Sequence, residues 1–269
     1  MRPRLYLHVL GLETRKLMSY RVDFWISAGV SFGVQLLLMH FLWTAVFAAT
    51  GAEAVGGRRF EDLMAYGLLV ILLGKIVWGF DVEGGLSQEI YDGAYTRYLV
   101  YPANYPAFKY AQQLGTLLPA LVQLALFGAL APLLVPVEGF RITASSLAMG
   151  AGALALGHLL HFLLVYPVQA VAFWADNVWS LMVMVRMSAH LLGGYLLPLD
   201  LYPAWAQEAL AWLPFRFLFY VPAQALLGGM GWSDWAREMS LGAGWCLALA
   251  AFGRAVWRRG DMRYTGVGI

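Results

Sequence analysis

The chain has 269 residues, of which 61% are hydrophobic, 15% aromatic and 13% charged. Soluble globular domains carry about 25% charged residues, so this composition excludes an ordinary soluble domain. A net charge of +2 is too small to indicate nucleic-acid binding, and the single cysteine, Cys246, permits no intrachain disulfide and no CxxC site.

Residues 1–21 open the chain with a basic, amphipathic segment. Arg4, His8 and Arg15 fall on one stripe at helical spacing, whereas Tyr6 and Leu10 face the other way. A helix of this kind suits a membrane surface, so we expect an interfacial helix here; the alternative is a frayed tail.

Several apolar runs then reach the ~20 residues that a helix needs to cross a bilayer. Backbone amides in hydrocarbon must be satisfied within the segment, and the alternation of a closed barrel is absent, so these runs are predicted to be helices. We therefore expect one all-α polytopic membrane domain over residues 1–269. The six predicted spans are residues 24–48, 62–80, 112–134, 145–173, 178–198 and 236–257.

The basic residues predict the orientation of these spans. With six spans both termini share a side, and eleven basic residues lie on that side: Arg2, Arg4, Arg15, Lys16, Arg21, Arg97, Lys109, Arg254, Arg258, Arg259 and Arg263. The opposite loops hold Arg58, Arg59, Arg141 and Arg216, with Arg237 at the margin. The positive-inside rule then predicts that both termini are cytoplasmic.

The longest connection on that side, residues 81–111, contains "EGGLSQEIYDG". A short helix here would place Leu86 and Ile90 on one face and end at Gly93. Its other face would carry the polar side chains of Gln88, Glu89 and Asp92.

The letters "DGAYTR" from Asp92 onward also resemble the start of an aspartate-rich motif of membrane lipid head-group transferases. Such enzymes use several carboxylates, but the next aspartate in this chain is Asp176. One carboxylate cannot hold a two-metal site, so this interpretation is disfavoured.

Polar side chains inside the predicted spans have two interpretations each. Arg186 either lines a pathway or has a structural role, and Lys75 lies close enough to the cytoplasmic end to reach the headgroups. His158 and His161 share a helix face and could ligate a metal, but hydrogen bonding between helices is favoured.

The segment 199–233 is apolar and aromatic, yet it is broken by Pro203, Pro214 and Pro222. Prolines at this spacing argue against one through-going helix. We expect two short helices that dip into the outer leaflet and return. The chain contains no P-loop, GxSxG or GxGxxG motif, so any ATP hydrolysis must come from another protein.

Two stretches carry a resemblance to a known family. "EIYDGAYTRYLVYPANYP" has an acidic-Ile pair, a glycine, a leucine and a proline in order: Glu89, Ile90, Gly93, Leu99 and Pro102. Residues 172–228 are similar to the family's Phe-Trp turn, Gly-x-x-x-Pro-Leu exit, Pro-Trp re-entrant segment and closing Leu-Pro-Phe. The chain thus resembles the small six-span permeases of ABC-2-type exporters over nearly its whole length.

The resemblance implies a type V ABC exporter-like fold, in which the 84–100 segment is a coupling helix resting in a groove of a cytoplasmic ATPase. The implied coupling residues are Leu86, Gln88, Glu89, Ile90, Asp92, Gly93 and Arg97. The implied substrate path lies between two permease chains, and its candidate lining residues are Phe32, Trp43, Lys75, Arg186 and His190. A re-entrant gate would cap the path outside, with Pro198, Pro203, Trp205, Pro214 and Phe215.

On this basis we expect a permease subunit of the bacterial cytoplasmic membrane that exports an amphiphilic substrate: a lipid, glycolipid, peptide or drug. Its expected partners are ABC ATPase subunits, membrane lipids and a second permease chain, identical or related. ATP and Mg would bind the ATPase, and this chain would hold no cofactor or metal and would not be an enzyme. The alternatives are a metal-dependent membrane transferase and an ion-coupled secondary transporter, which usually needs buried carboxylates that the middles of these spans lack.

Overall fold

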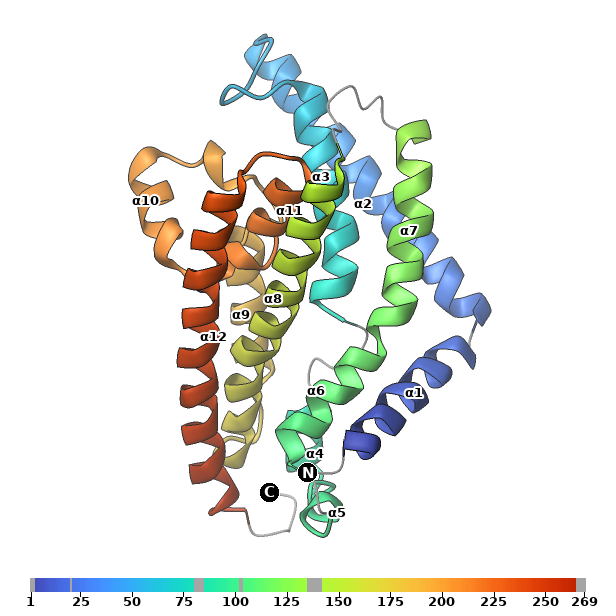
Figure 1. Ribbon diagram of the computed structural model, residues 1–269, viewed down its shortest axis with the longest axis vertical. Helices are drawn as coiled ribbons and strands as arrows, with labels where there is room; N and C mark the ends of the chain where they lie inside the picture. Colours follow the sequence, from blue (N-terminus) through green and yellow to red (C-terminus); the bar gives the residue numbers. More distant parts are fainter. Residues whose placement is uncertain (1–2, 20, 80–84, 102–103, 135–141, 265–269) are drawn as a thin grey trace.

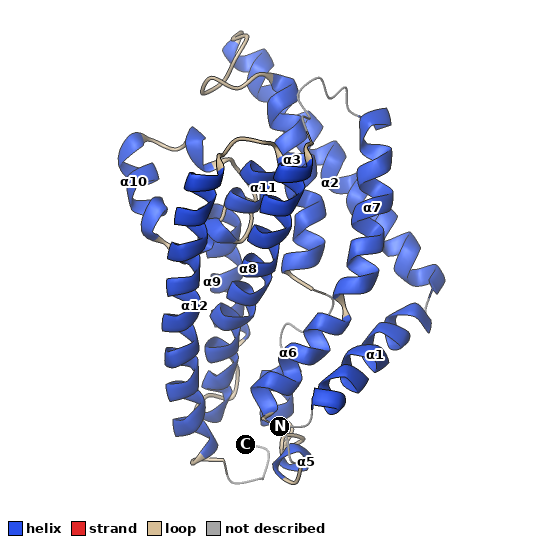
Figure 2. Cartoon of the chain, viewed as in Figure 1, coloured by secondary structure: helices blue, strands red, loops and turns tan. Residues whose placement is uncertain are grey.

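The computed structural model describes residues 3–19, 21–79, 85–101, 104–134 and 142–264, and within these ranges its regular elements are helices (Figures 1 and 2). The α-helices are α1 (Pro3–Ser19), α2 (Arg21–Thr50), α3 (Phe60–Val77), α4 (Gly85–Tyr91), α5 (Thr96–Leu99), α6 (Tyr105–Gly115), α7 (Leu117–Leu134), α8 (Ala144–Gln169), α9 (Trp179–Leu192), α10 (Ala204–Trp212), α11 (Tyr220–Leu226) and α12 (Trp232–Asp261). Three 3-10 turns lie between them: η1 (Ala170–Phe173), η2 (Leu199–Leu201) and η3 (Pro214–Phe217).

Four helical stretches of the described chain are long and apolar enough to cross a membrane. They are Trp25–Thr50, Tyr105–Leu130, Ala144–Phe173 and Trp232–Asp261. A fifth is possible if α10 and the stretch Pro214–Leu226, which are bent by 77° relative to each other, count as one broken span. The all-helical, polytopic class expected from the composition agrees with this arrangement.

Two of the six predicted spans correspond to helices that do not qualify as membrane spans by length and composition. The span 62–80 corresponds to α3, which has 18 residues and carries Glu61, Asp62 and Lys75. Although this helix is short and charged at its ends, every residue from Leu63 to Gly74 is buried. These residues are buried because α3 lies at the centre of the molecule and packs against α2, α7, α8 and α11. A helix that is apolar all round belongs in such a position.

The predicted span 178–198 is too long at its C-terminal end. Helix α9 has 14 residues and ends at Leu192, and at 1.5 Å per residue it is about 21 Å long, shorter than a bilayer core. The chain turns here because Gly194 adopts a φ of +86°, a left-handed conformation that favours glycine. The Tyr66 hydroxyl donates a 2.6 Å hydrogen bond to the Gly194 carbonyl and fixes the turn against α3.

Helix α8 packs against α11 and α12 to form the main core. At Gly157 of α8 a Cβ atom would lie 2.6 Å from the Phe217 carbonyl oxygen, so a glycine is needed for η3 to approach the helix. The ion pair between Arg216 Nη2 and Glu238 Oε1, at 3.0 Å, joins η3 to α12 on the same side.

Helix α1 lies along α6 at the end of the molecule that also holds α4 and α5 (Figure 1). The Thr14 hydroxyl donates to the Gly115 carbonyl at 2.7 Å, and Gln112 Nε2 donates to Glu13 Oε1 at 2.8 Å. Arg4, His8 and Arg15 are exposed, as the amphipathic pattern predicts. The side chains of Leu17 and Tyr20, and residues such as Arg141, lie outside what the structure describes.

Candidate functional site

The segment predicted to couple to an ATPase forms two short helices, α4 and α5, at the same end as α1. Leu86 and Ile90 are each 2% exposed and pack with Phe173 and Trp257. This packing matches the face predicted from helical spacing. Residue 84, at the start of the predicted segment, and Pro102 lie outside the described ranges.

The N-terminus of α4 is held by a side chain from α8. Gln169 Oε1 accepts hydrogen bonds from the backbone N–H groups of Leu86, at 3.0 Å, and Ser87, at 3.3 Å. The first N–H groups of a helix have no partner within the helix, so the buried Gln169 amide satisfies donors that would otherwise be orphaned. This role of Gln169 is not visible in the sequence, because it joins residues more than 80 positions apart.

The C-terminus of α4 agrees with the sequence prediction. Helix α4 ends at Tyr91, and Gly93 has a φ of +74°, so the residue expected to end the helix has the conformation that requires glycine. On the exposed face, Gln88 Nε2 donates to the Asp92 carboxylate at 2.9 Å. Gln88 and Asp92 therefore share the polar face that the sequence predicts.

Glu89 does not lie on that face, which corrects the prediction for this residue. Its Oε1 atom pairs with Lys109 Nζ of α6 at 2.7 Å and with Arg97 Nη2 at 3.3 Å. The hydroxyls of Tyr98 and Tyr105 also donate to the Glu89 carboxylate. The reason is the burial of Lys109, whose side chain is 8% exposed and needs a counter-charge nearby.

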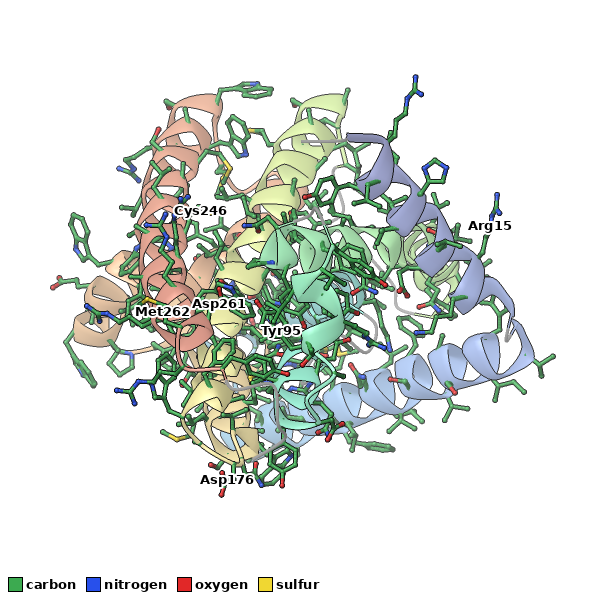
Figure 3. The ribbon with its side chains drawn as sticks, turned by 90° about the horizontal axis from the view of Figure 1, so that it is seen from below. Arg15, Tyr95, Asp176, Cys246, Asp261 and Met262 are labelled. Atoms are coloured by element: carbon green, nitrogen blue, oxygen red, sulfur yellow. The ribbon has the colours of Figure 1, made fainter. Side chains whose placement is uncertain are left out.

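The end of α12 holds the coupling segment from a second direction. The Tyr95 hydroxyl donates to Asp261 Oδ1 at 2.7 Å; both residues are labelled in Figure 3. The Tyr264 hydroxyl donates to the Gly93 carbonyl at 2.9 Å. Burial and the bond to Asp261 raise the pKa of Tyr95 well above its usual range, so the phenol stays protonated and keeps donating. The segment is thus fixed to α6, α8 and α12 before any partner binds.

The free side of the segment is apolar and aromatic at its tip. Tyr91, Leu99, Val100 and Tyr101 are exposed, with Val100 at 80%. Exposed Arg97 lies beside them. An exposed patch of this kind marks a surface that contacts a protein or a membrane.

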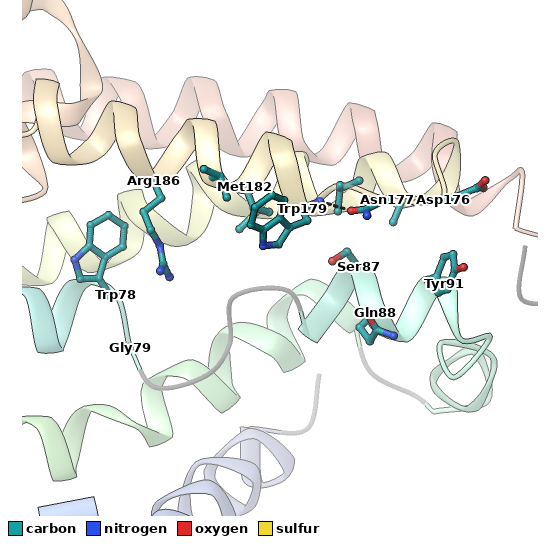
Figure 4. Close-up of a pocket in the computed structure, with 13 residues that line it drawn as sticks. Trp78, Gly79, Ser87, Gln88, Tyr91, Asp176, Asn177, Trp179, Met182 and Arg186 are labelled. Carbon is teal, nitrogen blue, oxygen red and sulfur yellow. Dashed lines mark hydrogen bonds between the residues drawn. The ribbon is translucent and has the colours of Figure 1, made fainter. Parts of the chain in front are cut away.

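A cavity of about 750 Å³ lies between the end of α3, α4 and the start of α9 (Figure 4). Trp78 and Arg186 are at one end, and Tyr91 and Asp176 are at the other. The Arg186 guanidinium lies 5.7 Å from the centre of the Trp78 ring. The cavity therefore lies between the coupling segment and α9. Its walls carry aromatic and apolar side chains and a few charged ones.

The other predicted pathway residues take different positions. His190 stacks at 5.0 Å on Trp78, which is a residue of the cavity wall. Lys75 Nζ donates to Ser31 Oγ at 3.2 Å and lines none of the described cavities. Phe32 and Trp43 are buried in the cluster formed by α2, α3 and α7, where Phe32 stacks on Phe127 at 4.8 Å. These two side chains have a packing role within this chain, and their predicted place on a path between two permease chains stays a prediction.

The predicted re-entrant segment is broken at two of its three prolines, whereas Pro222 lies within α11. Pro203 precedes α10 and Pro214 opens η3, whereas Trp205 of α10 is 75% exposed. Arg58 Nε donates to Asp200 Oδ2 at 2.6 Å and joins this segment to the loop between α2 and α3. Pro198 directly precedes η2, and Phe215 lies within η3.

The histidines take part in packing and hydrogen bonding. His158 Nδ1 lies 3.0 Å from the Ile76 carbonyl, and the His161 ring meets Trp78 edge-on at 4.9 Å. In the described part of the chain no three His, Cys, Asp or Glu side chains are grouped to hold a metal ion.

Comparison with known proteins gives one family. The family model described as "ABC-2 family transporter protein" matches residues 34–268. No curated protein matches the chain.

Proposed function

The chain belongs to the ABC-2 family of transporter proteins, and from this premise we propose that it is the permease subunit of an ATP-binding cassette exporter. A separate ATPase subunit supplies the energy and binds ATP and Mg. In this proposal the chain changes conformation to let the substrate cross the membrane, and it carries out no catalysis itself.

The proposed ATPase contact is the exposed side of the 85–101 segment. The observation that carries this proposal is the arrangement of α4: its apolar face is buried against α8, η1 and α12, while Gln88, Asp92 and the apolar tip around Val100 remain exposed. A short helix that is fixed to three other elements and exposed on one side transmits a push as a rigid body. In this proposal Asp92 contacts the ATPase, and Glu89 keeps the coupling segment attached to α6 through its ion pair with Lys109.

The proposed substrate is amphiphilic and is exported from the cytoplasm or the inner leaflet. The cavity at Trp78 and Arg186 opens beside the coupling segment, and its other walls include Trp179 and Met182 of α9. Aromatic and apolar walls with a few charged groups suit a lipid, glycolipid, peptide or drug molecule. Movement of α4 would change the shape of this cavity directly, because Ser87, Gln88 and Tyr91 form part of its wall.

The remaining features of the proposal follow the family. We place the chain in a bacterial cytoplasmic membrane with both termini in the cytoplasm, six membrane-crossing segments including the short α3 and α9, and a type V exporter arrangement. It pairs with a second permease chain, identical or related. Helix α2 presents exposed apolar side chains such as Ile26, Val30, Leu37 and Phe41, which suit contact with lipid or with that second chain.

Co-purification with a co-expressed ABC ATPase tests the docking proposal. The variants Asp92→Lys and Val100→Asp change the exposed side of the segment and leave its buried contacts intact. Glu208→Lys, an exposed site on α10 at the other end of the molecule, is the matched control. We expect both segment variants to lose most of the bound ATPase while the control retains it. Equal retention in all three would contradict the proposal.

A further inference from the structure

A second cavity, a groove of about 630 Å³, lies between two walls near the end of the molecule that holds α4 and α5. One wall comes from the coupling segment and α6, with Tyr98, Leu99 and Tyr105. The other comes from α8 and α12, with Leu163 and Arg254. It shares no lining residue with the cavity at Trp78 and Arg186.

The walls meet through ring contacts at the base of the groove. Tyr105 of α6 stacks on Trp257 of α12 at 5.2 Å, and Tyr110 contacts Phe162 of α8 at 4.9 Å. Tyr and Trp side chains are enriched where a membrane meets water. Helices α8 and α12 both belong to stretches able to cross a membrane, and a group of such rings on spanning helices indicates the level of the interface.

Two arginines lie on the groove at that level. Arg254 and Arg258 are one helical turn apart on α12, and both are exposed and line the groove. The acid among the lining residues is Asp261, whose Oδ1 already accepts the Tyr95 hydroxyl. Basic pockets between transmembrane helices on the cytoplasmic side are typical sites for acidic lipid headgroups.

The other part of the groove is apolar. Leu159 and Leu163 of α8 and Ala250 of α12 line it. Ala250 lies one turn from Arg254, further from the end of α12 and toward the middle of the membrane. Cationic side chains at the interface and apolar ones toward the hydrocarbon match the order of groups along a phospholipid.

We propose that this groove binds an anionic phospholipid of the adjacent leaflet, with its phosphate at Arg254 and Arg258 and one acyl chain against Leu159, Leu163 and Ala250. The bound lipid contacts both walls and so holds the coupling segment against α12. The cytoplasmic position of the groove and the influence of the lipid on ATPase coupling rest on the proposed function, whereas the binding measurement below depends on neither.

Native mass spectrometry of the purified full chain tests the proposal without any ATPase. The probes are dioleoyl-phosphatidylglycerol and dioleoyl-phosphatidylcholine, which differ only in their headgroups. The test variant is Arg254→Gln with Arg258→Gln, and the control is Arg237→Gln with Arg259→Gln, which removes the same charge from exposed sites outside the groove. We expect the unmodified chain and the control to prefer the anionic lipid by roughly tenfold, and the test variant to lose this preference.

A steric pair tests the acyl-chain half of the site. Ala250→Trp fills the groove, and Ala248→Trp places the same ring on an exposed position of α12 that does not line it. We expect only Ala250→Trp to reduce retention of both lipids. The proposal is overturned if the test arginine variant keeps the preference, if the control loses it equally, or if the two tryptophan variants bind alike. Since no transport or ATPase rate enters these results, failure here leaves the permease proposal standing.

Discussion

Glu89 and Lys109 are 20 positions apart in the chain, and their ion pair holds the coupling segment to α6. The pair is shielded, with the Lys109 side chain 8% and the Glu89 side chain 18% exposed, and Tyr98 and Tyr105 donate to the same carboxylate. A charge left alone at such a site is costly, because it has lost water and has no partner to replace it. The network therefore stabilises one orientation of α4.

Lys109→Ala removes one half of this pair and leaves Glu89 without its nearest cation. We expect a loss of about 3 kcal/mol in the free energy of unfolding, seen as a lower melting temperature in detergent. The double variant Glu89→Gln with Lys109→Met removes both charges and should recover much of the loss. Lys16→Ala, whose 3.8 Å pair with Glu13 is exposed, should cost less than about 1 kcal/mol. Equal melting temperatures for Lys109→Ala and Lys16→Ala would contradict this account.

At the residue scale, the sequence predicts what depends on near neighbours. Helical spacing is enough to place Leu86 and Ile90 on the buried face, and Gly93 marks the end of α4 through its left-handed φ. The position of the Glu89 side chain cannot be predicted in this way, because it depends on the ion pair with Lys109. Lys109 comes close to Glu89 only because α6 packs beside the coupling segment. The capping role of Gln169 is hidden for the same reason.

Helix α1 braces α6 at the scale of whole elements, and their close approach depends on Gly115. A Cβ atom at this position would lie 2.7 Å from the Leu10 carbonyl oxygen and 2.8 Å from Glu13 Cβ. The hydrogen bond from Thr14 to the Gly115 carbonyl requires the same short separation. The two helices can therefore pack in this way only with a glycine on α6.

Gly115→Ala should push α1 away from α6 and lower the stability by about 1–3 kcal/mol. Gly128→Ala in α7 is the control, since its added Cβ meets only Leu72 Cδ1, at 3.9 Å. That change should be neutral or stabilising by up to about 1 kcal/mol, because alanine favours a helix more than glycine does. Melting temperatures of the two variants check the prediction; a stable Gly115→Ala variant would mean that α1 does not depend on this contact.

The helices that were predicted well are those with long, unbroken apolar runs, such as α2, α8 and α12. The predicted span 112–134 misses the break at Thr116, where α6 ends and α7 begins. There the Thr116 hydroxyl donates to the Gln113 carbonyl at 2.7 Å, a local bond that competes with the regular helix. The early end of α9 is also a tertiary effect, since Tyr66 of α3 fixes the Gly194 turn.

At the scale of the whole molecule, the cavity at Trp78 and Arg186 connects the coupling segment to α9. If a substrate enters there, a larger side chain at Met182 should block it, whereas the same change at exposed Met184 on another face of α9 should not. We expect Met182→Trp to reduce ATP-driven transport of fluorescent amphiphiles into inverted vesicles several-fold, with ATPase co-purification unchanged. Identical transport by the Met182→Trp and Met184→Trp variants would show that the cavity is not on the route.

Composition and the long apolar runs together predict the fold class of the molecule, because a chain with so few charges must bury its apolar surface in a membrane and the runs are long enough for spanning helices. Composition does not predict which residues line a pathway. On an apolar helix the faces toward lipid, core and cavity carry the same residue types, so the sequence alone does not predict that Phe32 and Trp43 are buried in packing within this chain. Arg186, for which the sequence leaves both a pathway role and a structural role open, lies on the wall of a cavity, as is usual for a charge inside a membrane protein.

The side of the membrane on which the 85–101 segment lies tests the central claim most directly. Replacing Cys246, the only cysteine, by Ser gives a background in which Val100→Cys or Trp205→Cys introduces one exposed thiol at either end of the molecule. A membrane-impermeant maleimide should label the Trp205→Cys variant in intact cells, and should label the Val100→Cys variant only in inverted vesicles. Labelling of the Val100→Cys variant in intact cells would place the segment outside the cytoplasm and contradict the account of an ATPase-driven permease.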